Sequence, residues 1–252
     1  MARVVLTQPL PRIARLACRL RAAGHEVVEL PGKRVVALPE ADGWGARRLD
    51  DADWVVFVSP GGIEVALGAL DGRWPAEVGI AVIGPGSLDE LARWVPADAG
   101  ARIVRPARAP YDAQSLMHEA PFSSPCGLRV LVVRGERGRT DWIDALRTRG
   151  ATVEVATLYR SEPSLPSSTQ IARLQEWVAE DRSAMFVFTS LDAVTTTESV
   201  LGAAGALGWA RACSAITQHS RIREALHRSG WRSVRLVEPG ERGLLAGIES
   251  GT

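Results

Sequence analysis

Residues 128–163 read LRVLVVRGERGRTDWIDALRTRGATVEVATLYRSEP, and this stretch gives the clearest indication of the fold class. It opens with an apolar run at 129–134 that lacks strict alternation, which is typical of a strand buried on both faces of a sheet. A helical pattern follows, and after Gly150 a second extended run covers residues 152–159. A strand, a helix and another strand in this order predict a parallel sheet with helices packed on it.

The same alternation of strand and helix continues along the rest of the chain. Residues 10–20 carry an apolar stripe with arginines on the opposite side, which predicts an amphipathic helix that ends at Gly24. Further apolar runs that predict buried strands lie at residues 3–7, 54–59, 80–84, 185–190 and 214–217. The fold class is therefore α/β.

The chain also repeats this pattern. Residues 3–27 align without gaps onto residues 129–153, at an offset of 126. Three more correspondences follow in the same order at offsets of 131, 133 and 133, namely 57–63 with 188–194, 83–87 with 216–220, and 103–106 with 236–239. This repetition predicts two α/β units of similar topology.

Two long extended stretches suggest how the units are connected. One runs from residue 25 to residue 38 and the other from residue 152 to residue 166; both contain prolines and look too long for one strand each. We infer that the chain crosses between domains twice. The expected domains are 1–32 with 167–252, and 40–158, with linkers at 33–39 and 159–166. Composition alone also allows a simple tandem split near residue 126.

Composition restricts the classes of function. The 252 residues are 46% hydrophobic, enough for real cores, and the net charge of +1 excludes the overall basic excess of a general nucleic-acid binder, although not a local basic patch. No run approaches the roughly 18 apolar residues of a membrane span, and the N-terminus begins as a strand. We expect a soluble, cytoplasmic monomer. Reduced thiols in or near the core are expected for all three cysteines: Cys18, Cys126 and Cys213.

Small and polar residues follow the predicted strands at their carboxyl ends, where open α/β sheets bind ligands. Helix N-termini at such positions present free N–H groups and a partial positive charge, which suits an anionic ligand. An arginine adds the parallel N–H groups of its guanidinium, a fork that binds one carboxylate. The expected binding residues are Thr7, Gln8, Ser59, Gly61, Gly84, Gly86, Ser87, Arg134, Gly135, Thr189, Ser190, Gln218, His219 and Ser220.

Several of these residues also have a purely structural explanation. Three are candidate helix N-caps: Ser59, Thr189 and Ser190. Gly84 and Gly86 would also be explained by a tight turn between strand and helix. Taken alone, Arg134 fits a surface or ion-paired position.

The sequence shows no signature of a metal or cofactor site. No spacing of His, Cys, Asp and Glu suggests a metal, and neither a P-loop nor a nucleophile elbow occurs. Neither repeat has a complete G-x-G-x-x-G, which disfavours a nucleotide- or flavin-binding protein. Solvated side chains in turn or helix contexts are expected for His25, His118 and His227.

Four strings, in this order along the chain, resemble the uroporphyrinogen-III synthase family. They are VVLTQP at 4–9, IAVIGPGS at 80–87, the long string at 128–163 and FVFTSLDAV at 186–194. The resemblance implies two similar three-layer α/β domains with parallel sheets, joined by a two-stranded connection, and it favours the crossed arrangement over the tandem one. The chain departs from the family at Gln8, where an arginine is common, and after Ser59, where an asparagine-containing turn is common.

The resemblance also implies a function. Such a chain would be a cofactor-free enzyme with its active site in the cleft between the domains. It would close hydroxymethylbilane, a linear chain of four pyrroles bearing acetates and propionates, into uroporphyrinogen III. The reaction releases water and inverts the last ring through a spiro intermediate. By resemblance to the Leu-Tyr-Arg strand of the family, Tyr159 is the candidate proton donor, because a phenol is protonated at neutral pH. The alternative is a structural role, in which Tyr159 packs at the hinge.

A competing interpretation has no catalysis. A two-domain binding protein for a small anionic molecule would have the same cleft and hinge, but it would not need a general acid.

Overall fold

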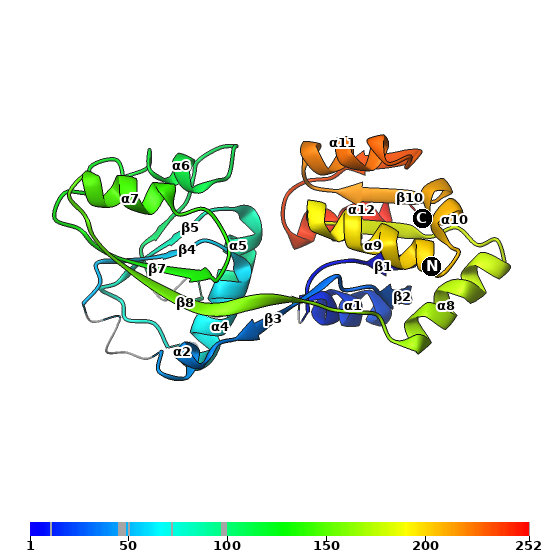
Figure 1. Cartoon of the computed structure of the whole chain (residues 1–252), viewed down its shortest axis with the longest axis horizontal. Coiled ribbons are helices and arrows are strands. Elements are labelled where there is room, and N and C mark those ends of the chain that lie inside the picture. The colour runs from blue at the N-terminus through cyan, green and yellow to red at the C-terminus, as the bar shows by residue number, and fades with distance from the viewer. Residues whose placement is uncertain (11, 45–48, 50, 72, 97–99, 252) are drawn as a thin grey trace. The chain divides into compact units, whose positions relative to one another are not determined.

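A computed structural model of the chain describes residues 1–10, 12–44, 49, 51–71, 73–96 and 100–251. These residues form two compact units, Met1–Val35 with Glu162–Thr252, and Val36–Ser161 (Figure 1). Each unit is built on a mainly parallel sheet with helices on both faces, so the predicted α/β class is confirmed. In the described part of the chain, no helix is both long enough and apolar enough to span a membrane.

Five parallel strands form the sheet of the first unit, in the order β11-β10-β9-β1-β2. The strands are β1 (Arg3–Leu6), β2 (Glu26–Glu29), β9 (Met185–Phe188), β10 (Ser214–Thr217) and β11 (Ser233–Leu236). One face of the sheet is covered by α1 (Arg12–Ala22) and α12 (Glu241–Glu249). The other face is covered by α8 (Ser168–Ala179), α9 (Leu191–Ala203), α10 (Leu207–Ala212) and α11 (Ser220–Arg228).

Side chains from the central strands alternate between two cores, because successive residues of a strand point to opposite faces. Val4 and Leu6 pack with the apolar stripe of α1, whereas Val5 lies in the core beneath α8 and α9. In that second core the ring of Phe186 meets Trp231 edge-on, with centroids 4.9 Å apart. Burial on both faces explains why these strands read as continuous apolar runs.

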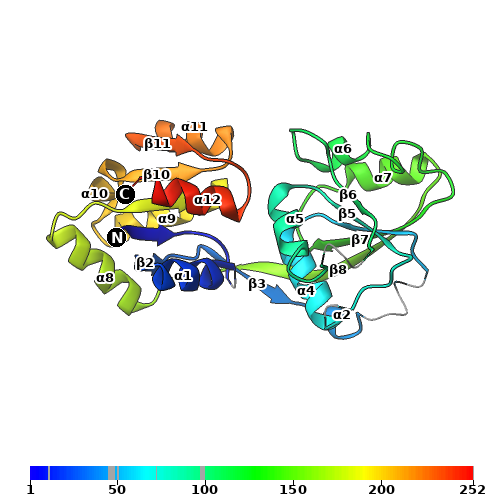
Figure 2. The ribbon, with the colours of Figure 1, turned by 180° about the vertical axis from the view of Figure 1, so that it is seen from behind.

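The second sheet has the order β3-β8-β7-β4-β5-β6. Its strands are β3 (Lys33–Ala37), β4 (Trp54–Phe57), β5 (Gly79–Val82), β6 (Ile103–Val104), β7 (Arg129–Gly135) and β8 (Thr152–Pro163). One face packs against α2 (Pro39–Asp42), α4 (Pro60–Ala69) and α5 (Pro85–Leu91), and the other against α6 (Ala113–Leu116) and α7 (Asp141–Thr148) (Figure 2). Strands β4 to β8 run parallel.

The internal repeat appears in the sheets strand by strand. The order β2-β1-β9-β10-β11 of the first unit corresponds to β8-β7-β4-β5-β6 of the second. The sequence alignment matched residues of each strand pair except β5, where the matched segment begins at the next residue, Ile83. The strand-helix-strand segment opens the chain in the first unit but closes the second unit as β7-α7-β8. The two units therefore share a topology in permuted chain order.

Two strands carry the chain between the units. The boundaries after Val35 and after Ser161 fall inside β3 and β8. These strands run antiparallel, because the N–H of Leu38 donates to the carbonyl of Leu158 while that of Ser164 donates to Gly32. The expectation that each long stretch exceeds one strand was wrong for the second stretch: β8 is continuous over 12 residues, since it pairs with both β7 and β3.

All three cysteines are free, but the expected position in or near the core was right only for Cys213, which is buried, and burial raises the pKa of its thiol. Cys18 and Cys126 are exposed. Cys18 lies outside the buried stripe of α1, and Cys126 lies in the turn before β7. Neither position was distinguishable from the core by residue type alone.

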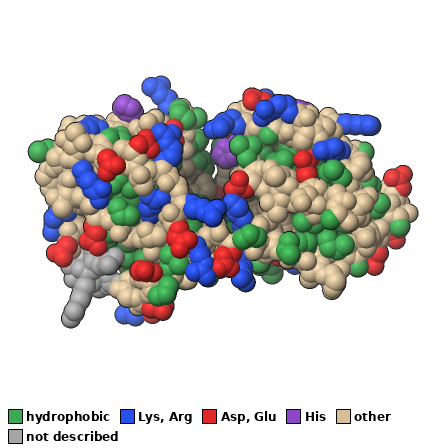
Figure 3. Space-filling view, in the orientation of Figure 1, with side chains coloured by type: hydrophobic (Ala, Val, Ile, Leu, Met, Phe, Trp, Pro, Cys, Tyr) green, Lys and Arg blue, Asp and Glu red, His purple; other side chains and the backbone are tan. Residues whose placement is uncertain are grey.

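Charged side chains of both signs are interspersed over the face drawn in Figure 3. That distribution agrees with the formal net charge of +1.

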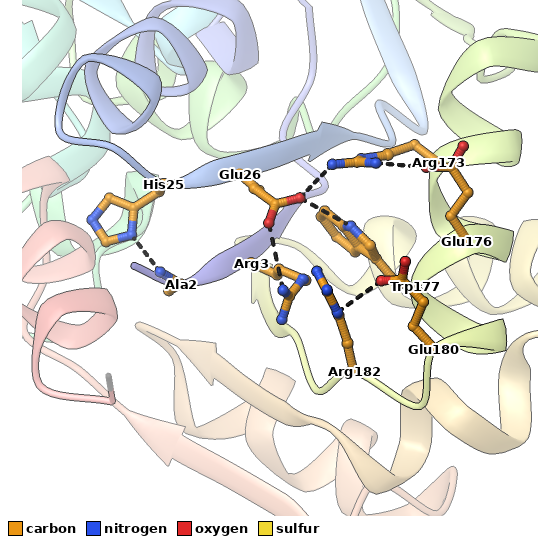
Figure 4. Close-up of polar contacts among 9 residues, drawn as sticks. All are labelled: Ala2, Arg3, His25, Glu26, Arg173, Glu176, Trp177, Glu180 and Arg182. Carbon is orange, nitrogen blue, oxygen red and sulfur yellow. Dashed lines mark hydrogen bonds and ion pairs between the residues drawn. The ribbon is translucent and has the colours of Figure 1, made fainter.

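Glu26 is the centre of a polar network that ties α8 to the edge of the first sheet (Figure 4). Its carboxylate accepts a hydrogen bond from Arg173 at 2.5 Å and one from the indole N–H of the buried Trp177 at 3.3 Å. It also lies 3.5 Å from the guanidinium of its strand neighbour Arg3. The Glu26 side chain is only 21% exposed, so these contacts are partly shielded from water.

We expect Glu26→Ala to lower the free energy of unfolding by about 1–3 kcal/mol, because it leaves a buried N–H and a shielded arginine without their acceptor. Glu176→Ala is the matched control. Glu176 is 55% exposed and pairs with Arg173 one helical turn away, so its loss is expected to cost at most about 0.5 kcal/mol. Denaturant unfolding of both variants checks this, and equal effects would contradict it.

Candidate active site

Each sheet has one point where the strand order reverses. In the first sheet it lies between β1 and β9, and in the second between β4 and β7. Ligands of open α/β sheets bind outside the carboxyl ends of the strands at such points. Seven of the expected binding residues follow these four strands directly or end them: Thr7, Gln8, Ser59, Arg134, Gly135, Thr189 and Ser190.

A cavity of about 340 Å³ lies at the reversal point of the second unit, entirely within that unit. Its lining comes from the carboxyl ends of β4, β5, β7 and β8 and from the segments around the starts of α6 and α7. The lining residues are Val58, Ser59, Ile83, Asp112, Ala113, Gln114, Arg134, Arg137, Gly138, Arg139, Asp141, Trp142 and Tyr159. Three expected site residues therefore meet in one cavity: Ser59, Arg134 and Tyr159.

A bulge in β8 positions Tyr159. β7 and β8 pair in step up to Arg134 with Thr157, but the next pair joins Gly135 to Tyr159, so Leu158 is an extra residue. Bulges bend a strand and redirect a side chain, often beside a functional site. The redirected ring lies against Gly135, where a Cβ atom would stand 2.8 Å from ring carbons. Gly135 therefore has a definite role: only a residue without a side chain leaves room for this tyrosine.

The Tyr159 hydroxyl is paired with Ser59, at an Oη–Oγ distance of 2.6 Å. Ser59 is also the N-cap of α4, and its Oγ accepts the N–H of Gly62. Either hydroxyl can donate in this pair. When Ser59 donates its proton to the tyrosine oxygen, its Oγ still accepts the N–H of Gly62 at the cap. The proton of Tyr159 is then available to a group in the cavity. The N-cap interpretation of Ser59 is confirmed, and it is compatible with a role in the site.

Arg134 holds the loop that follows β7. It is 8% exposed, and it donates from Nε to the carbonyl of Gly135 at 3.0 Å and from Nη2 to that of Gly138 at 2.8 Å. The interpretation of Arg134 as a surface or ion-paired residue was wrong. Two backbone carbonyls of a turn occupy its fork, and this fixes the cavity wall.

Arg139 and Asp141 form a two-point ion pair at the cavity rim, with N–O distances of 3.0 and 2.7 Å. The hydrogen bond from Arg139 holds the pKa of Asp141 below its usual value. Asp112 lies on the same lining and caps α6 by accepting the N–H of Ser115. In the described part of the chain, the guanidinium of Arg137 has no hydrogen bond or ion pair.

The residues around the start of α5 do not line this cavity, although Ile83 just before them does. Gly84 is the N-cap of α5, and Gly86 and Ser87 lie in its first turn. The φ of Gly84 is −139°, which any residue adopts, so a tight turn does not explain glycine there. Gly61 is buried in the first turn of α4.

In the first unit, the residues after β1 and β9 are largely engaged within the protein. The hydroxyl of Thr7 is buried and donates to the carbonyl of Val187 at 2.7 Å. Ser190 caps α9 by accepting the N–H of Ala193, which confirms its N-cap interpretation, whereas Thr189 precedes the cap. Gln8 differs, because it is 4% exposed and its side-chain oxygen has no hydrogen-bond partner among the residues that the structure describes.

The residues after β10 have mixed surroundings. The amide of Gln218 donates to the carbonyls of Glu238 and Gly240, at 2.8 and 2.5 Å, and so braces the loop before α12. His219 and Ser220 are exposed at the N-terminus of α11. Of the histidines expected to be solvated, His118 and His227 are exposed, but His25 is partly buried and lies 3.2 Å from the N–H of Ala2.

Sequence reasoning missed several residues of the cavity. Arg137 and Arg139 lie in the loop directly after β7, so the rule that strand ends line the site would have found them had it been extended by a few residues. No position after a predicted strand marked Asp112 or Gln114. They line the cavity from the start of the short helix α6. Among the described residues, no group of three His, Cys, Asp or Glu side chains is placed to hold a metal.

Comparison with known proteins agrees with this architecture. No curated protein sequence matches the chain significantly. A mutant uroporphyrinogen III synthase from the extremely thermophilic bacterium Thermus thermophilus is 18% identical, with a TM-score of 0.52 over 100% of this chain and 97% of the other. Uroporphyrinogen-III synthetase from Helicobacter pylori is 12% identical, with a TM-score of 0.54 over 100% of both chains. Because the identities are only 18% and 12%, these similarities show the fold alone.

The sequence family is shown by a separate match. A family model described as uroporphyrinogen-III synthase HemD matches residues 14–245, which is nearly the whole chain. The matched region includes the cavity and the reversal point of the second sheet, whereas β1 of the first sheet precedes it. The chain belongs to the uroporphyrinogen-III synthase family.

Proposed function

We propose that this chain closes hydroxymethylbilane into uroporphyrinogen III, and that Tyr159 is the proton donor to the hydroxyl that leaves as water. Membership of a family of cyclising lyases supports the reaction. One observation supports the role of Tyr159: the residue lines a cavity of about 340 Å³, and its hydroxyl lies 2.6 Å from that of Ser59, which can donate a hydrogen bond.

The first step breaks the carbon–oxygen bond of the hydroxymethyl group. The pyrrole nitrogen supplies its lone pair to the carbon that is left, forming an azafulvenium cation, and the bond electrons leave with oxygen. That oxygen takes the proton of Tyr159 and departs as water. Ser59 stabilises the resulting phenolate by donating a hydrogen bond, and the N-terminus of α4, which Ser59 caps, adds its partial positive charge.

Ring closure follows without a further acid. The cationic carbon bonds to the substituted α-carbon of the last pyrrole and gives the spiro intermediate. The old bond to the bridging carbon breaks, and that carbon bonds to the free α-carbon of the same ring, which inverts it. The proton displaced from this α-carbon returns the tyrosine to its neutral form, so the net change is loss of one water.

Holding the flexible chain in a bent shape supplies much of the rate. Proximity and orientation contribute up to about 7–11 kcal/mol in favourable cases. We propose that helix N-termini and strand-end groups bind the carboxylates of the substrate. The side-chain oxygen of Gln8 is proposed to accept a hydrogen bond from a pyrrole N–H, because it is buried and has no donor in the described part of the chain.

We further propose that the protein acts as a cytoplasmic monomer. All three cysteines are free, which fits a reducing compartment.

The decisive experiment resolves the isomers of the product. Purified protein is incubated with freshly generated hydroxymethylbilane, and the products are oxidised and separated. We expect the type III porphyrin. Type I alone is the product of spontaneous closure; that result would refute the proposed enzyme and leave a non-catalytic binding protein.

A further inference from the structure

Arg137 lies on the cavity lining with a guanidinium that, among the described residues, contacts no acceptor. The two other arginines of the lining are already engaged, Arg134 with backbone carbonyls and Arg139 with Asp141. An arginine fork suits a carboxylate, which it binds through two parallel hydrogen bonds. Arg137 is therefore the cation of this cavity that has its fork free for a ligand.

The loop that carries Arg137 is held in place. The neighbouring residue on its C-terminal side is Gly138, whose carbonyl accepts from the buried Arg134 at 2.8 Å. Gly138 has a φ of 132°, a backbone conformation that side chains rarely adopt, so the turn is shaped around a glycine. A fixed backbone reduces the conformational entropy that Arg137 loses when it binds a ligand.

The rest of the lining combines apolar and charged surface. Val58, Ile83 and Trp142 supply apolar side chains on which a flat ring can lie. Three arginines and two aspartates line the cavity, so its formal charge is +1. Both aspartates are engaged, Asp141 with Arg139 and Asp112 with a helix N-terminus, and the unengaged charge is that of Arg137.

We propose that Arg137 is a specificity-determining residue: it binds a carboxylate of the one pyrrole ring that the cavity holds beside Tyr159. The inference rests on the proposed function. A volume of about 340 Å³ lies at the lower end of the range for small-ligand sites, roughly 300–1,000 Å³, so it suits one ring and not four. Since Tyr159 protonates the departing hydroxyl, the ring beside it is the one that carries the hydroxymethyl group.

The test compares Arg137→Gln with Arg93→Gln, an exposed arginine of the same unit that does not line the cavity. For Arg137→Gln we expect KM for hydroxymethylbilane to rise about 10–100-fold, the usual effect of losing a hydrogen bond to a charged group, with kcat within about threefold. Arg137→Lys keeps the charge but loses the paired N–H groups, so its KM should lie between those of the wild type and Arg137→Gln. Arg93→Gln should match the wild type.

A second measurement is independent of turnover. Titration with uroporphyrin III, the oxidised product, followed by fluorescence quenching, should give weaker binding to Arg137→Gln and a smaller loss of affinity with added KCl, because one ion pair is gone. Unchanged thermal unfolding would show that the variant is folded.

The outcomes separate the two proposals. A wild-type protein that makes only the type I isomer overturns the proposed function. A wild type that makes type III, with Arg137→Gln equal to Arg93→Gln in KM and in porphyrin affinity, overturns the role of Arg137 and leaves the function intact. A fall in kcat at unchanged KM would also overturn it, because the arginine would then act in the chemistry and not in binding.

Discussion

Tyr159→Phe is expected to lower kcat by about 10²–10⁴-fold, because it removes the proton donor while keeping the ring. The aromatic ring packs against Gly135, and the ring of phenylalanine can make the same contact. Turnover should fall without disappearing, since orientation of the substrate and the electron push of pyrrole nitrogen persist. Initial rates of type III formation with fresh hydroxymethylbilane measure the effect.

Ser59→Ala serves as the companion variant. It removes the partner of the phenol at 2.6 Å but leaves the proton donor, so we expect a loss of no more than about tenfold, the value of one hydrogen bond. It also removes the cap of α4, which costs about 1 kcal/mol of stability. Full activity of Tyr159→Phe would remove the proposed acid and leave the function standing. Equal losses in both variants would mean that the pair acts only by positioning.

Gly243→Ala is expected to produce the largest loss of stability, about 3 kcal/mol, at the upper end of the usual cost of overpacking. Gly243 is buried in the first turn of α12, and a Cβ there would stand 1.9 Å from the backbone oxygen of Glu238. That oxygen cannot withdraw freely, because it accepts the amide of Gln218 at 2.8 Å. Thermal unfolding should show a melting temperature lower by roughly 10 °C.

Gly202→Ala is the matched control for this prediction. Gly202 lies in α9 with no atom within 4 Å of the Cβ position, and it is exposed. The same change there should stabilise the protein by about 0.5–1 kcal/mol, since alanine has the higher helix propensity. A neutral Gly243→Ala would show that the loop before α12 yields easily.

The fold class and the correspondence between the two units could be predicted from the sequence. Apolar runs without alternation are a local consequence of burial on both faces, so each central strand was visible in its own residues. The ordered repeat then matched β1 to β7 and β9 to β4, and the two sheets have that correspondence. The amphipathic stripe of α1 was visible for the same reason, because helical periodicity is a property of neighbouring residues.

The length of β8 was not visible in this way. Residues 152–163 form one strand because two different partners pair with it, β7 along its first part and β3 further on. Strand length depends on such partners, and local sequence does not specify them.

Which residues meet at the site depends on the tertiary structure and not on the local sequence. Ser59 and Tyr159 are separated by 100 residues, and they meet because β4 pairs with β7 and β7 with β8. The bulge at Leu158 and the missing side chain at Gly135 then direct the phenol into the cavity. The contrast between Arg134, held by two carbonyls, and Arg137, left free among the described residues, also arises from the path of one loop. Hydrogen-bond partners are set by three-dimensional proximity, and two arginines in one loop look equivalent until that path is known.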